Sequence, residues 1–187
     1  MHPSYTAAFE GQPEAFYFFM QGYHAHMRGQ WERAVEFHQK SIESYPTAQA
    51  YTFLGWSKSH LGDLEDAILQ CKNAIFIQPG FGNPYNDIGV YLIQKEQPEP
   101  AIEWLEKALG APDYESYYFP HINLARIHFS KKRFEKALKH FKAALNENPR
   151  DDNAREMMEW IKETGLRQKG FSVETDPEGR DKAPERP

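Results

Sequence analysis

Bulky, small and polar residues recur along the chain in a fixed order, in four copies. Each copy starts with an aromatic residue or His, has a small residue four positions later, passes through a turn to an Ala, and ends at a Pro. Such small residues leave room for two antiparallel helices to approach closely, while bulky residues fill the hollows between them. The pattern therefore predicts four helical hairpins. The small residues are Gly22, Gly55, Gly89 and Ala125 on the first helices and Ala34, Ala67, Ala101 and Ala137 on the second.

The residue order within each copy resembles the tetratricopeptide repeat. That repeat is about 34 residues long, with W-x2-L-G-x2-Y in its first helix, A-x3-F in its second and Pro at its end. The second copy reads Tyr51-x2-Leu54-Gly55, Ala67-x3-Cys71 and Pro79, and the fourth reads His121-x2-Leu124-Ala125, Ala137-x3-Phe141 and Pro149. The resemblance implies an all-α fold, a right-handed α–α superhelix of four helical hairpins. The repeats are expected at about residues 15–47, 48–81, 82–117 and 118–151.

The turns between paired helices carry their own signals. Gly29 and Gly62 follow the first helices of two repeats, where a left-handed residue commonly ends a helix. Asp63 is placed to cap the next helix. The third repeat instead has Pro98 and Pro100, and a helix tolerates Pro only in its first turn. We therefore expect its second helix to begin near Pro98.

The two ends of the chain depart from the repeat. The pattern predicts a capping helix with one apolar stripe at residues 152–164. Asp151 or Asp152 is expected to cap its N-terminus. Such a helix covers the last hydrophobic face of a repeat stack. Residues 165–187 are charged and contain Pro and Gly, which is typical of a disordered tail. Residues 1–14 show no period and are expected to be irregular, packed over the first repeat or lying along its groove.

Function is expected on the concave surface, which the first helices line in a stack of helix pairs. The inner positions are aromatic or apolar at both ends and carry amides in the middle, and an exposed apolar strip usually marks a binding site. This predicts a non-catalytic adaptor that binds a peptide or amphipathic helix of another protein. The predicted groove residues are Phe16, Phe19, Tyr23, Met27, Thr52, Trp56, His60, Asn86, Val90, Phe119, Ile122 and Arg126.

Three alternatives stay open. The chain could self-associate as a scaffold, because 14% of its residues are aromatic. It could bind an acidic C-terminal tail, as co-chaperone repeats do with a clamp of Lys and Asn on their first helix. Here Phe19 and Tyr23 stand at those clamp positions, and only Asn86, Asn123 and Arg126 support this alternative. Finally, Phe16, Phe19 and Tyr23 could simply be covered by residues 1–14, or they could pack into the second repeat.

Chemistry beyond binding finds little support in the sequence. The lone cysteine, Cys71, allows no internal disulfide, and the eight histidines include no pair at ligand spacing with a third ligand. We therefore expect no enzyme, cofactor or metal site. A net charge of −5 argues against nucleic acid. Neither a membrane-spanning apolar run nor a secretory signal is visible, so a cytoplasmic location is expected.

Overall fold

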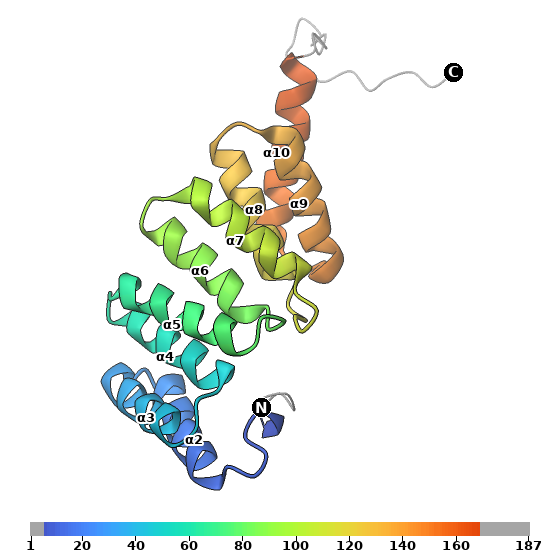
Figure 1. Ribbon diagram of the computed structural model, residues 1–187. Helices are drawn as coiled ribbons and strands as arrows, with labels where there is room; N and C mark the ends of the chain where they lie inside the picture. Colours follow the sequence, from blue (N-terminus) through green and yellow to red (C-terminus); the bar gives the residue numbers. More distant parts are fainter. Residues whose placement is uncertain (1–5, 169–187) are drawn as a thin grey trace, which may run out of the picture.

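The protein is a stack of helical hairpins. The computed structural model describes residues 6–168, and in that part of the chain each hairpin packs on the next from the N-terminal to the C-terminal end (Figure 1). The pairs are α2 with α3, α4 with α5, α6 with α7, and α8 with α9, followed by α10. Their bounds are α2 Pro13–Met27, α3 Trp31–Ser44, α4 Ala48–His60, α5 Leu64–Ile77, α6 Asn83–Gln94, α7 Pro98–Gly110, α8 Tyr118–Ser130, α9 Phe134–Glu147 and α10 Asp152–Gln168. The predicted all-α superhelix is confirmed.

The helix ends lie close to the predicted boundaries. The first helix begins at Pro13, slightly before the predicted start at residue 15, and α7 begins at Pro98 as predicted. The capping helix α10 continues to Gln168 instead of ending at residue 164. The predicted disordered tail is therefore wrong for residues 165–168, because the helix continues through them. Its remaining part lies outside the described residues.

Small residues lie where the paired helices touch. A Cβ atom on Gly55 would stand 2.9 Å from the backbone oxygen of Ala67, and one on Gly89 would stand 2.6 Å from Cδ2 of Leu105. Ala67 and Ala101 are themselves fully buried. The close approach predicted for these helices is confirmed, and it explains why larger residues are absent at these positions.

Left-handed residues end the first helix of every hairpin. Gly29 and Gly62 have φ angles of 70° and 85°, and Glu96 and Lys132 take the equivalent places with φ angles of 59° and 56°. A left-handed conformation costs a residue with a Cβ about 1 to 2 kcal/mol. The third and fourth hairpins therefore carry backbone strain that glycine relieves in the first two.

Replacing Glu96 by glycine is expected to stabilise the fold. Removing the left-handed strain outweighs the greater unfolded-state entropy of glycine, so Glu96→Gly should raise the free energy of unfolding by about 0.5 to 1 kcal/mol. Urea denaturation measures the change. Glu96→Ala, which removes the same exposed side chain but keeps Cβ, is the control and should bring no gain. Equal stability of the two variants would contradict the strain argument.

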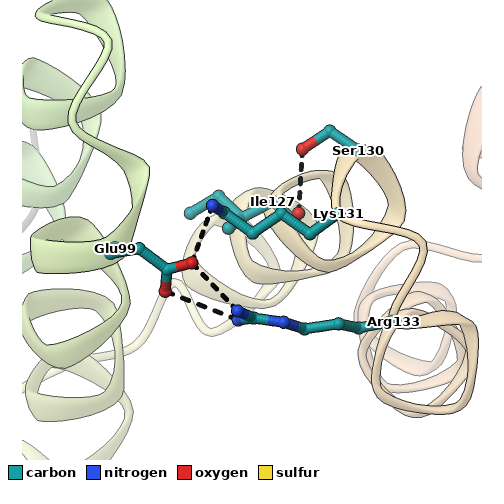
Figure 2. A network of polar contacts seen from close by, with 5 residues as sticks. All are labelled: Glu99, Ile127, Ser130, Lys131 and Arg133. Carbon is teal, nitrogen blue, oxygen red and sulfur yellow. Dashed lines mark hydrogen bonds and ion pairs between the residues drawn. The ribbon is translucent and has the colours of Figure 1, made fainter.

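Ion pairs link neighbouring hairpins at equivalent places. Glu99, in the first turn of α7, contacts Lys131 Nζ at 2.7 Å and Arg133 Nη2 at 2.9 Å, both from the turn between α8 and α9 (Figure 2). Glu65, in the first turn of α5, likewise pairs with Lys95 at the end of α6. Exposed pairs of this kind contribute little to stability individually. Both pairs join the first turn of a second helix to the end of the first helix in the next hairpin.

The two ends of the stack are covered differently. At the N-terminal end, residues 6–12 form hydrogen-bonded turns that place the buried Phe9 ring 4.8 Å from the ring of Phe19. At the other end, Ala154 and Ile161 of α10 pack in one cluster with Phe141. Asp151 caps α10 by accepting a hydrogen bond from the Ala154 amide at 3.0 Å. The predicted sealing role of α10 is confirmed.

Candidate functional site

A groove of 340 Å³ lies on the inner side of the stack, between α4 and α6. We call it the central groove. Trp56 and His60 of α4 and Asn86 and Val90 of α6 line it, and Phe119 at the start of α8 closes one side. Trp56 is 42% exposed and Phe119 is 53% exposed. Two large aromatic side chains thus stand open to solvent around a hollow.

Half of the predicted groove residues line the central groove. They are Thr52, Trp56, His60, Asn86, Val90 and Phe119. All come from the second, third and fourth repeats, whose first helices lie side by side along the inner face (Figure 1). Their role in binding stays a prediction.

The first repeat does not contribute as expected. Phe19 is fully buried, because Phe9 covers it from one side and Phe53 packs edge-on at 5.5 Å from the other. Phe16 is half-buried beside Phe9, and Tyr23 is half-buried against Phe53. The expectation of an open groove at Phe19 is therefore wrong. The alternative that residues before position 15 cover this face holds for Phe16 and Phe19. Its other form, packing into the second repeat, holds for Phe19 and Tyr23, which both contact Phe53.

Three further predicted residues lie outside the central groove. Ile122 is 4% exposed and belongs to the core shared with Phe141, so the prediction that it lines an open groove is wrong. Met27 and Arg126 are exposed, but neither lines the hollow. The groove is consequently shorter than predicted.

Several lining residues were missed. Asp87 and Tyr91 belong to the same stripe of α6 as Asn83, Asn86 and Val90, with helical spacing of three and four. That spacing could have placed Asp87 in the groove. Tyr114 gave no such signal, because it comes from the loop between α7 and α8.

That loop is held against the preceding repeat. The Asp113 amide donates to the Gly80 carbonyl at 2.9 Å, and Gln78 Nε2 donates to Asp113 Oδ2 at 3.2 Å. Tyr114 is buried on Gly82, where its ring leaves no room for a Cβ. The loop therefore forms a fixed wall of the groove.

The floor of the central groove is polar and acidic. Burial raises the pKa of Asp87 to about 7, while a hydrogen bond from Asn86 Nδ2 at 3.4 Å opposes the shift. Burial, together with the Asp87 carboxylate, also raises the pKa of Tyr91. Asn86 is 9% exposed, and its Oδ1 accepts no hydrogen bond from the described residues. Buried acceptors without a donor are uncommon in folded proteins.

A second hollow of 520 Å³ continues from the first and shares Phe81, Asn83 and Ser116 with it. Asp113 and Glu115 line this extension. Among the described residues that line the two hollows, carboxylates occur but neither Lys nor Arg does. The continuous surface is thus acidic.

Histidines support one wall of the groove. His26 contacts the Trp56 ring at 4.3 Å between centroids, and its Nδ1 lies 2.9 Å from Ser57 Oγ. The His60 ring stacks on Trp31 at 3.9 Å. In residues 6–168, His, Cys, Asp and Glu form no group of three or more that could hold a metal ion. The histidines near the groove are packing residues that hold Trp56 in place.

The repeat family emerges from comparison with known proteins. Residues 83–112 and 118–151 each match the tetratricopeptide repeat. The chain is a tetratricopeptide-repeat protein. The matches cover the third and fourth hairpins, and the same geometry extends to the first two. Concave surfaces of such repeat stacks typically serve protein–protein interaction.

Solved structures support the fold of this tetratricopeptide-repeat protein. Pseudomonas aeruginosa PilF is 18% identical with a TM-score of 0.76, over 83% of this chain and 70% of PilF. MamA is 18% identical with a TM-score of 0.69, over 83% of this chain and 85% of MamA. YrrB, a TPR protein with an unusual peptide-binding site, is 20% identical with a TM-score of 0.65, over 89% of this chain and 86% of YrrB. No curated protein matches the chain.

Within residues 6–168, none of the helices has both the length and the apolar character needed to cross a bilayer.

Proposed function

We propose that this tetratricopeptide-repeat protein is a non-catalytic adaptor that binds a peptide segment of a partner protein in the central groove. The observation that carries the proposal is the pair of exposed aromatic side chains, Trp56 and Phe119, around a hollow of 340 Å³. Burying such an anchor stabilises a complex by about 1.5 to 3 kcal/mol. Ordering the peptide offsets part of this gain, so micromolar affinity is expected.

The charge of the groove bears on the alternatives. A clamp for an acidic C-terminal tail needs cations, whereas the described lining residues supply Asp87, Asp113 and Glu115. Co-chaperone-like tail binding is therefore disfavoured. Self-association stays a prediction, and the exposed Leu69, Phe76 and Ile77 on α5 are the apolar residues such a contact would use.

Removing both aromatic anchors is expected to abolish partner binding. The double variant Trp56→Ala with Phe119→Ala removes exposed side chains and should keep its fold. Affinity capture from the source cells, quantified by mass spectrometry, should recover partners with the wild type and lose them with this variant. Loss of two anchors predicts at least about a tenfold fall in recovery.

Tyr17→Ala provides the matched control. Tyr17 is 58% exposed on α2 and lies outside both hollows, so its removal should leave recovery unchanged. Equal recovery with the double variant and the wild type would rule out the central groove as the binding surface.

A further inference from the structure

We propose that the central groove selects peptides with a basic anchor, a Lys or Arg side chain that pairs with Asp87. This inference deepens the proposed function and rests on it. The occupant is one positively charged side chain of a partner peptide, inserted between the aromatic walls of the groove.

The position of Asp87 supports this choice. Asp87 is half-buried among the lining residues, and its carboxylate accepts a long hydrogen bond of 3.4 Å from Asn86 Nδ2. A carboxylate withdrawn from water stays ionised at neutral pH only when a cation or strong donors compensate its charge. Because the described lining residues include neither Lys nor Arg, the compensating cation is expected from the ligand.

Asn86 supplies an independent observation. Its side chain is 9% exposed, lines the groove and carries an Oδ1 that accepts no hydrogen bond from the described residues. An ammonium has three donors and a guanidinium has five. One cationic head can therefore satisfy both Asn86 and the neighbouring Asp87.

The aromatic walls fit the same kind of ligand. Trp56 and Phe119 are exposed at the groove, and cations bind favourably over the faces of such rings. The long methylene stem of Lys or Arg can pack on these rings while its head reaches the floor. The extension of the groove adds Asp113 and Glu115, which favour further basic residues along the peptide.

Selection from a library of random linear peptides tests the proposal. The purified full chain is used as bait, and bound peptides are sequenced. Enrichment of Lys or Arg at one position is expected with the wild type and not with Asp87→Asn. Glu103→Gln makes the same change of charge on the exposed face of α7 and is the matched control; it should enrich the same peptides as the wild type.

Affinities then measure the pairing directly. The best peptide and a copy with norleucine in place of its basic residue are compared by fluorescence polarisation. Asp87→Asn should lower the affinity for the basic peptide at least about tenfold and the affinity for the norleucine peptide less than about twofold. Equal losses for both peptides would overturn the pairing.

The pH dependence of peptide binding tests the pairing in the wild-type protein itself. Because burial raises the pKa of Asp87 to about 7, its ionised form dominates at pH 8 and is lost by pH 6. The basic peptide should therefore bind several-fold more weakly at pH 6 than at pH 8, and the norleucine peptide should not. The groups facing Asp87 are Cys71 of α5, Tyr91 of α6 and Tyr114 of the loop, and His60 of α4 lines the same groove. The dependence should persist in His60→Gln and vanish in Asp87→Asn; persistence in Asp87→Asn would overturn the assignment.

The outcomes separate this inference from the proposed function. If the selected peptides carry no basic residue but do not bind the double variant Trp56→Ala with Phe119→Ala, the groove remains the binding site and the basic anchor is overturned. Failure to enrich any peptide that depends on Trp56 and Phe119 would overturn both.

Discussion

Phe19→Ala is expected to destabilise the protein by about 3 to 5 kcal/mol, the usual cost of removing a fully buried Phe. The Phe19 ring is fully buried and lies 4.8 Å from Phe9, 5.5 Å from Phe53 and 5.7 Å from His38 between ring centroids. These neighbours come from the N-terminal turn, from α4 and from α3. The ring thus joins three separate segments, and its loss leaves a cavity that none of them can fill alone.

Urea denaturation followed by far-ultraviolet circular dichroism measures this loss. Tyr17→Ala is the control on the same helix, because Tyr17 is 58% exposed and its removal should change stability by less than about 0.5 kcal/mol. A loss below about 1 kcal/mol for Phe19→Ala would contradict the packing described for the first repeat. It would return Phe19 to the exposed inner face that the sequence predicts.

The repeats could be predicted because their signals are local. Gly55 and Gly89 recur at a fixed distance from a bulky residue, and each lies against the partner helix of its own hairpin. Pro98 begins α7, since Pro fits the first turn of a helix and not its interior. Such constraints act between residues of one hairpin, which are close in the chain, so they leave a pattern that can be recognised in the sequence.

The groove was predicted only in part because its walls come from distant segments. The burial of Phe19 depends on Phe9, which belongs to a stretch without periodicity. Tyr114 reaches the groove only because its loop is held by Gly80 and Gln78. Asp87 is different, since its place follows from the helical spacing of Asn83 and Asn86. A carboxylate in the amide-bearing inner stripe of α6 was the overlooked signal.

His38→Leu is expected to make the protein less sensitive to acid. His38 is fully buried beside Gly22, and neither of its ring nitrogens has a hydrogen-bond partner within the described residues. Burial, and to a smaller extent the nearby His26, lowers its pKa from 6.5 to about 3. The folded protein therefore keeps His38 neutral at pH values where the unfolded chain already binds a proton.

The direction of the effect follows from this difference. For a base whose folded pKa is lowered, stability is complete above the unfolded pKa and declines as the pH falls toward the folded pKa. Between pH 7.5 and pH 5.0, His38 should cost the fold about 2 kcal/mol, at 1.36 kcal/mol for each pH unit below 6.5. Burial also lowers the pKa of His26 to about 4, and this adds to the loss. Asp87 acts in the opposite direction, because its raised pKa makes the folded state bind a proton first.

Comparing variants isolates the contribution of His38 from these other groups. The free energy of unfolding is measured in urea at pH 7.5 and pH 5.0, and the difference between the two pH values is compared between proteins. The loss of unfolding free energy between pH 7.5 and pH 5.0 should be about 2 kcal/mol smaller in His38→Leu than in the wild type, whatever the variant's stability at pH 7.5. His24→Gln, which alters an exposed histidine on α2, should leave the difference unchanged. An unchanged difference in His38→Leu would mean that this imidazole gains a proton in the folded protein as readily as in the unfolded chain.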